Sequence, residues 1–189
     1  EPEPAPSLPS ASQFFGPGTG ISLAGLVYCI EFFKLDAQHT TSDVCHAYIK
    51  PATVPAGWRN TPELITVDDD GNDISARCWY KHTYFEEASG ARQLAPPPGT
   101  QSMCAALASD PATAEYVGAP SVFLSHAWLY KFVNVVEGLK GLEATLSDDE
   151  PERFYWFDCF SIDEHATQSL PQEWWGTTFK EAIGMIGHT

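Results

Sequence analysis

The stretch from Ser121 to Ile162 most constrains the fold of this 189-residue chain. It begins with a short apolar run that ends at Ser125 and His126, and it closes with an aromatic run that starts at Phe154. Between the two runs, apolar residues recur at helical spacing: Leu129, Phe132, Val133, Val136 and Leu139. Two apolar runs joined by an amphipathic helix predict a βαβ unit, in which the two strands are parallel neighbours.

Polar residues follow both predicted strands. Ser125 and His126 end the first, whereas Asp158, Ser161 and Asp163 end the second. The strands are almost continuously hydrophobic, which is typical of parallel strands covered on both faces. Ligands of open α/β sheets bind outside the carboxyl ends of the strands, so this edge is the expected place for a small-molecule site. The plainer interpretation is that these residues form turns and helix caps, and spacing alone favours it for most of them.

Two kinds of catalytic site are disfavoured by spacing. Ser125, His126 and Asp158 are the residue types of a hydrolase triad, but adjacent side chains of a strand point to opposite faces and no G-x-S-x-G motif is present. His126, Asp158, Glu164 and His165 are metal-donor types, but no pair has a recognised ligand spacing. We therefore expect neither a hydrolase triad nor a metal site.

The net charge and the cysteine content limit the partners and the cellular compartment that we expect for the protein. The net charge of −15 makes nucleic acid and anionic membranes improbable partners. The longest apolar stretch, from Ile21 to Phe33, contains Glu31 and is too short to span a bilayer. The five cysteines are widely spaced, without a C-x-x-C motif, and predict reduced thiols. We expect an intracellular protein, in the cytoplasm or in an organelle such as a plastid.

The chain divides into three predicted regions: a Pro/Gly-rich tail over 1–20, a helical and hairpin region over 21–118, and a βαβα core over 119–189. In the second region, Ser22 begins a predicted helix that runs to Lys34. Thr40 and Asp43 have the spacing of a capping box, and Pro51 is expected to end the helix that they begin.

Further elements are predicted around the central stretch. A hairpin is expected from strands at 64–67 and 74–80, which flank an acidic turn, and a short helix is expected at 102–108. A last helix is expected to begin near Thr177, with Phe179, Ile183 and Ile186 on its buried face.

Several separated blocks resemble a family of TIR-like domains (Toll/interleukin-1 receptor-type) that is frequent in algae and other protists. The blocks are Phe123–Trp128, Tyr155–Asp163 and Trp174–Trp175 before Phe179. The second block is also similar to the tryptophan-isoleucine-aspartate block of heterokaryon-incompatibility (HET) domains, which are relatives of TIR domains. The segment from Thr40 to Thr53 is similar to one that often precedes the strand motif in the algal proteins.

The resemblance implies a flavodoxin-like parallel sheet with flanking helices, self-association and, in some branches, cleavage of NAD at the nicotinamide–ribose bond. Catalytic TIR domains use a glutamate at the start of the helix after the second strand, which Glu173 or Glu164 would provide here. Such a carboxylate would stabilise the cationic transition state. A complete TIR fold has further strands and helices, so we expect this chain to hold an incomplete one.

Two functions follow as hypotheses. In the first, the protein is a non-catalytic scaffold for signalling or assembly that docks to other protein subunits or to itself. In the alternative, it is an NAD-cleaving or nucleotide-binding enzyme with NAD as its substrate. The residues expected to contact a ligand are Ser125, His126, Trp128, Asp158, Asp163 and Trp174, since a tryptophan would stack on a flat ring.

Overall fold

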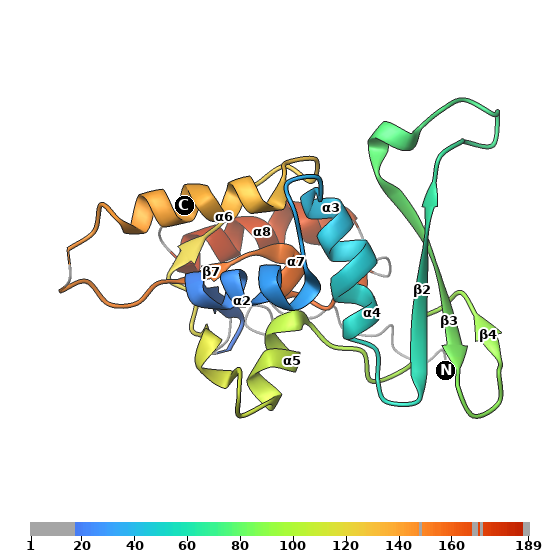
Figure 1. Cartoon of the computed structure of the whole chain (residues 1–189), viewed down its shortest axis with the longest axis horizontal. Helices are drawn as coiled ribbons and strands as arrows, with labels where there is room; N and C mark the ends of the chain where they lie inside the picture. The colour runs from blue at the N-terminus through green and yellow to red at the C-terminus, as the bar shows by residue number, and fades with distance from the viewer. Residues whose placement is uncertain (1–17, 148, 168–169, 171, 187–189) are drawn as a thin grey trace, which may run out of the picture.

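The computed structural model describes residues 18–147, 149–167, 170 and 172–186, so most of the predicted tail lies outside the described residues. The strands are β1 (Gly20–Ser22), β2 (Trp58–Ile65), β3 (Trp79–Glu86), β4 (Arg92–Gln93), β5 (Val117–Gly118), β6 (Val122–Phe123) and β7 (Phe154–Trp156). The helices are α2 (Leu23–Phe33), α3 (Thr41–Asp43), α4 (Lys50–Ala52), α5 (Met103–Ser109), α6 (Phe132–Glu143), α7 (Asp158–Ser161) and α8 (Gln172–Ile186). The fold is mixed α/β, with the β2–β3 hairpin standing at one end of the molecule (Figure 1).

The predicted βαβ unit is confirmed. Strands β6 and β7 are parallel neighbours, with Val122 opposite Tyr155 and Phe123 opposite Trp156. Helix α6 connects them, and its buried residues Phe132, Val136 and Leu139 belong to the predicted apolar stripe. The helix is shorter than the pattern suggested, because the residues before Phe132 form a turn.

Helices cover both faces of the β6–β7 pair. Adjacent residues of a strand point to opposite faces. Tyr155 belongs to the main core with residues of α6, and its hydroxyl donates to Glu143 of that helix across 2.8 Å. Trp156 instead packs with Phe123, Ile162 and Ile186, the last of these from α8. Helices α6 and α8 therefore lie on opposite faces, as the hydrophobic runs predicted.

The four-stranded sheet is mixed rather than wholly parallel. Its order is β5-β1-β7-β6, and β1 runs antiparallel to both of its neighbours. The three residues of β1 are fully buried and include Gly20, which the sequence placed in the tail. A Cβ atom at Gly20 would lie 2.9 Å from Pro120 Cα and from Phe154 Cβ, so the close approach of these strands requires glycine.

The second strand is shorter than predicted. It ends at Trp156, and Asp158–Ser161 forms helix α7. The Ser161 hydroxyl accepts a hydrogen bond from the Phe157 backbone N–H at 2.9 Å, and the Ile162 N–H donates to the Asp158 carbonyl at 3.0 Å. A continuous apolar run fits a buried strand or a buried helix equally well, so periodicity could not locate this boundary.

The predicted caps are present in the N-terminal region. Ser22 accepts from the Gly25 N–H, and Thr40 and Asp43 form the reciprocal capping box. The prediction that the helix ends at Pro51 was wrong by one residue, because the helix continues to Ala52. A π-helical segment, Val44–Ile49, leads into α4, which includes Pro51 near its start and ends at Ala52. Proline has no N–H to continue the helical hydrogen bonds, and the helix ends one residue after it.

The predicted hairpin is present, but its strands were predicted at the wrong positions: the observed strands share only 64–65 and 79–80 with the predicted ones, and Ser75–Arg77 forms a short 3-10 helix. Strands β2 and β3 pair antiparallel over eight residues each. On β3 only His82 and Tyr84 are buried, two residues apart, which identifies the face turned towards the helices.

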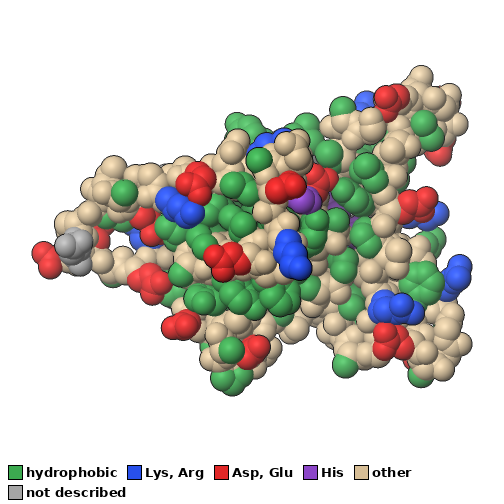
Figure 2. Space-filling model, viewed as in Figure 1, with side chains coloured by type: hydrophobic (Ala, Val, Ile, Leu, Met, Phe, Trp, Pro, Cys, Tyr) green, Lys and Arg blue, Asp and Glu red, His purple; other side chains and the backbone are tan. Residues whose placement is uncertain are grey.

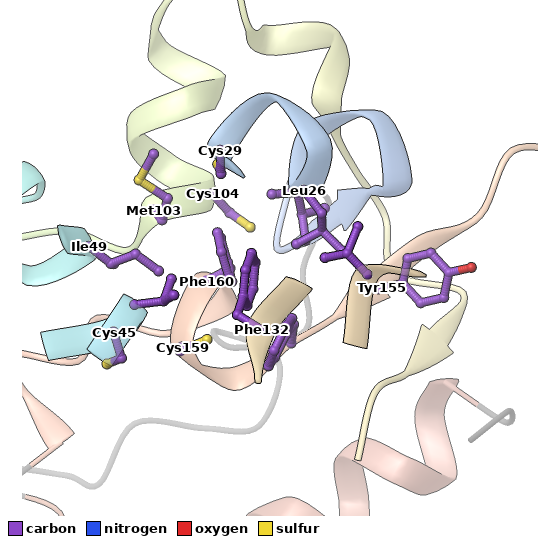
Figure 3. Packing of buried hydrophobic residues seen from close by; sticks show 14 of the residues in the cluster. Leu26, Cys29, Cys45, Ile49, Met103, Cys104, Phe132, Tyr155, Cys159 and Phe160 are labelled. Atoms are coloured by element: carbon purple, nitrogen blue, oxygen red, sulfur yellow. The ribbon is translucent and has the colours of Figure 1, made fainter. Parts of the chain in front are cut away.

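The main core lies among α2, α5, α6, α7 and β7. Phe132 stacks on both Phe157 and Phe160. Cys29, Cys104 and Cys159 are buried in the same core (Figure 3). All five cysteines are unpaired. Among the described helices, none combines the length and the apolar character that crossing a bilayer requires.

Candidate functional site

His126 and Asp158 meet at the carboxyl ends of β6 and β7. The His126 Nδ1 atom lies 3.6 Å from Asp158 Oδ1, and the two side chains are only 4% and 15% exposed. This is the edge at which the sequence predicted a polar cluster. The parallel strands bring the two residues together although they are 32 positions apart in the sequence.

Burial controls the charge of this pair. It lowers the pKa of His126 to about 4 and raises the pKa of Asp158 to about 6. At pH 7 the imidazole is therefore neutral and the carboxyl is mostly ionised. Among the described residues, the Nε2 atom of His126 is buried without a hydrogen-bond partner. The pair is thus a buried polar contact rather than a strong ion pair.

Ser125 and Trp128 lie on the outer side of this pair. Ser125 is exposed, whereas the His126 side chain is buried, in agreement with side chains that point to opposite faces. The Trp128 ring is edge-on to His126 at 5.4 Å and remains 38% exposed. A hollow of about 380 Å³ adjoins them, and it is lined by Ser125, His126, Tyr130, Lys131, Asn134, Val135 and Gly138.

Asp163 does not join His126 and Asp158 but holds a loop in place. Its carboxylate accepts a hydrogen bond from the Thr100 hydroxyl at 2.7 Å and another from the His165 backbone N–H at 3.0 Å. Both carboxylate oxygens are thereby used in structural contacts. Asp163 therefore anchors the segment after α7 to the loop that precedes α5.

Glu164 is buried beside Lys50. The Lys50 Nζ atom donates to the backbone carbonyl of Glu164 at 2.9 Å. Burial, followed by the nearby charge of Asp158, raises the pKa of Glu164 to about 8, so this carboxyl is mostly protonated at neutral pH. Burial also lowers the pKa of Lys50. A neutral, enclosed carboxyl is poorly suited to stabilise a cationic transition state.

Glu173 and Trp174 lie in the first turn of α8, which begins at Gln172 rather than near Thr177. Trp174 is 3% exposed, so it is a packing residue rather than an exposed stacking platform. The side chain of Glu173 lies outside the described part of the structure, as does that of Phe179. Ile183 is exposed, so its predicted place on the buried face was wrong.

Two groups of histidine contacts were not predicted: His165 was considered only as a metal donor, and His46 and His82 were not considered. His165 is held between Thr53 Oγ1 at 3.0 Å and the Tyr84 hydroxyl at 2.8 Å. His46 Nδ1 lies 3.1 Å from His82 Nε2, and His82 Nδ1 lies 2.9 Å from Asn60 Oδ1. The spacing of His82 and Tyr84, two positions apart in a run of strand-forming residues, is the sequence signal that could have indicated an inward polar face.

Burial keeps these imidazoles neutral. It lowers the pKa of His46 and of His165 to about 4, and that of His82 to about 3. His46 and His82 join the hairpin to the π-helical segment, and His165 joins it to the end of α4 through Thr53. Among the residues that the structure describes, no three His, Cys, Asp or Glu side chains are arranged to hold a metal ion.

Comparison of the chain with protein-family models, with curated proteins and with solved structures gives no match.

Proposed function

We propose that this chain is a TIR-like module that docks to other protein subunits in a signalling or assembly complex and does not itself catalyse a reaction. The observation that carries the proposal is the arrangement around β6, a strand that forms one edge of the described sheet and is flanked by helices on both faces. An edge strand offers backbone groups for pairing with another chain.

The topology supports a flavodoxin-like arrangement. In doubly wound sheets, a helix on the second face leads to a strand on the far side of the first strand. Here α6 and α8 lie on opposite faces, and β6 has a sheet neighbour only on the β7 side among the described residues. The proposal is therefore a partial doubly wound core, to which the antiparallel strands β1 and β5 are added.

The state of Glu164 supports a non-catalytic role. This carboxyl is buried, mostly protonated at pH 7 and next to Lys50. The unpaired thiols of the described cysteines support the intracellular location that belongs to the same proposal.

One observation favours NAD cleavage as a second candidate. Helix α8 begins at Gln172, which puts Glu173 in its first turn, after the second strand of the unit. This is where the resemblance implies a catalytic glutamate. The hollow beside Ser125 and His126 would then receive part of the dinucleotide.

Incubation of the purified chain with NAD separates the two candidates. We expect no nicotinamide release from the wild-type protein, from Glu164→Ala or from Glu173→Ala. Circular dichroism of each protein confirms that it is folded. Nicotinamide release by the wild type that Glu173→Ala abolishes would replace the scaffold proposal with the enzymatic one.

A further inference from the structure

A groove follows the side of α2 that is not buried in the core. It consists of two hollows of about 450 and 200 Å³ that share Tyr28. The α2 residues that line it recur at helical spacing and are Leu23, Ala24, Val27, Tyr28, Glu31 and Phe32. The larger hollow is bounded by α6 and the smaller one by α5. We call this feature the α2 groove.

The α2 groove carries a ladder of aromatic rings. The Tyr28 ring packs on Tyr116 at a centroid distance of 5.3 Å and stacks on Phe32 at 5.6 Å. Gly25 permits the approach of Tyr116, since a Cβ atom there would lie 2.8 Å from Tyr116 Cβ. Phe32 is 59% exposed, and Figure 2 shows hydrophobic side chains gathered over α2. Aromatic rings that are held in place at a surface are typical anchors of protein interfaces.

The lining of the α2 groove is negatively charged. Its carboxylates are Glu31, Asp110, Glu143 and Glu152. Among the described residues, none of these four forms an ion pair with a basic side chain. Lys140, the one basic side chain among the described lining residues, is paired with Glu137 at 2.7 Å. The groove therefore offers carboxylates that lack a cation.

Glu143 is fixed in a position to receive such a cation. Its Oε1 atom accepts a hydrogen bond from the buried Tyr155 hydroxyl at 2.8 Å, whereas Oε2 has no hydrogen-bond partner among the described residues. Aromatic faces attract guanidinium groups, and arginine pairs with a carboxylate through two parallel hydrogen bonds. Rings and carboxylates in one groove therefore fit arginine side chains.

We propose that the α2 groove binds a basic amphipathic helix of a partner protein, with arginine side chains on its carboxylates and apolar side chains against Tyr28 and Phe32. The inference rests on the proposed docking function, and it names the surface and the chemistry of the partner. One side of α2 makes a straight wall more than two turns long, and such a wall is complemented by a second helix.

Charge distinguishes this partner from other occupants of the groove. The Pro-rich segment 1–17 contains two glutamates and neither lysine nor arginine, so it would add negative charge. A second copy of the chain carries the same net charge of −15 and would be repelled. A small polyamine would neutralise the carboxylates but would leave the exposed Phe32 ring uncovered.

Fluorescence anisotropy with a labelled synthetic peptide tests the proposal. The peptide is a helix-forming sequence of leucine, arginine and glutamine, with leucine along one side and arginine at both edges of that side. Its control replaces each arginine by citrulline, which has a similar shape and no charge. The wild-type chain should bind the arginine peptide at least about tenfold more tightly than the citrulline peptide.

Two charge-reversal variants locate the binding surface. Glu31→Lys/Glu152→Lys should weaken binding of the arginine peptide at least about tenfold, because like charges then face each other. Asp69→Lys/Asp70→Lys, in the acidic turn of the hairpin, changes the net charge by the same amount. This control should change the dissociation constant less than about twofold at physiological ionic strength, since distant charges are screened.

A second pair of variants tests the aromatic ladder. Phe32→Ser removes an exposed ring from the groove and should weaken binding about fivefold or more. Trp79→Ser removes a ring of similar exposure, 53%, from the hairpin and should leave binding unchanged. Thermal melts show that each variant is folded, and Phe32→Ser decides alone if Glu31→Lys/Glu152→Lys does not fold.

Three outcomes would overturn the inference: no binding of the arginine peptide, equal binding of the citrulline peptide, or equal effects of the two charge-reversal variants. Self-association that Glu31→Lys/Glu152→Lys abolishes would also overturn it, because the groove would then hold a second copy. A chain that binds no peptide and releases no nicotinamide from NAD would leave docking at another surface standing. Nicotinamide release would refute the proposed function whatever the peptide does.

Discussion

The Nζ atom of Lys50 donates a hydrogen bond to the backbone carbonyl of Glu164 across 2.9 Å, and both residues are buried. This contact joins α4 to the segment that follows α7, two parts of the chain separated by 114 positions. A buried cation is costly unless it is hydrogen-bonded. The contact therefore explains how a lysine is tolerated beside a core thiol, that of Cys45.

The protonation of Glu164 makes stability depend on pH. Its pKa is raised from an ordinary 4.5 to about 8 in the folded protein, so the unfolded chain loses this proton first as pH rises. The contribution of Glu164 is fully present below pH 4.5 and is lost between about pH 4.5 and pH 8. Glu164→Gln keeps a neutral side chain of similar shape. Urea unfolding should show that this variant gains stability relative to wild type as pH rises through that window; a constant difference would contradict the buried neutral carboxyl.

The buried histidines have the opposite effect in acid. The folded-state pKa values of His82 and His165 lie near 3 and 4, below the ordinary 6.5, so the unfolded chain binds protons first as pH falls. Their contribution is complete above pH 6.5 and is lost as pH falls towards 4. His82→Gln should be less stable than wild type at pH 7 but should lose less stability between pH 6.5 and pH 4. NMR titration of the imidazole signals is an independent check, and pKa values near 6.5 would refute the prediction.

Tyr84 supports the segment after α7 through His165. Its hydroxyl lies 2.8 Å from His165 Nδ1 in a buried setting. Tyr84→Phe leaves that nitrogen without its partner, and it should lower the free energy of unfolding by about 1–2 kcal/mol. Tyr130→Phe is the matched control, since Tyr130 is exposed and should change stability by less than about 0.5 kcal/mol. Equal effects of the two changes in chemical denaturation would contradict the role given to this hydrogen bond.

Two helical glycines should respond in opposite directions to alanine. A Cβ at Gly25 of α2 would lie 2.8 Å from Ile21 Cγ1 and 2.8 Å from Tyr116 Cβ, whereas one at Gly141 of α6 meets nothing within 4 Å. Gly141→Ala should stabilise the protein by about 0.5–1 kcal/mol through helix propensity. Gly25→Ala should destabilise it by about 1–3 kcal/mol, because overpacking outweighs that gain. Thermal melts decide, and a stabilised Gly25→Ala would show that α2 packs more loosely than described.

Strong local patterns carried most of the successful predictions. The helical stripe between two apolar runs led to β6, α6 and β7, and the caps at Ser22 and Thr40 located two helix starts. The three-residue strand β1 was not predictable, because its strand character comes from pairing with β5 and β7 rather than from its own sequence. Asp158 was expected just after a strand but begins helix α7. The sequence could not show this, because an aromatic run is compatible with both structures.

The candidate site was only partly predictable for the same reason. His126 and Asp158 were expected together because parallel strands end at one edge. Asp163 and Glu164 are held elsewhere, by Thr100 and Lys50, through contacts that no local pattern encodes. Burial also changes the charge expected for Glu164: the sequence suggested an ionised carboxylate, but the side chain is mostly a neutral acid in the folded protein.

The parallel pairing of β6 with β7 underlies both the fold and the proposed function, and nuclear Overhauser contacts across this pair test it most directly. We predict amide-to-Hα contacts that place Val122 beside Tyr155 and Phe123 beside Trp156, in the pattern of parallel strands. Contacts from Phe123 and Trp156 to Ile186 should accompany them, since α8 covers that face. Close Hα-to-Hα contacts, which are characteristic of antiparallel strands, or no contact between the two segments, would contradict the fold and the proposals built on it.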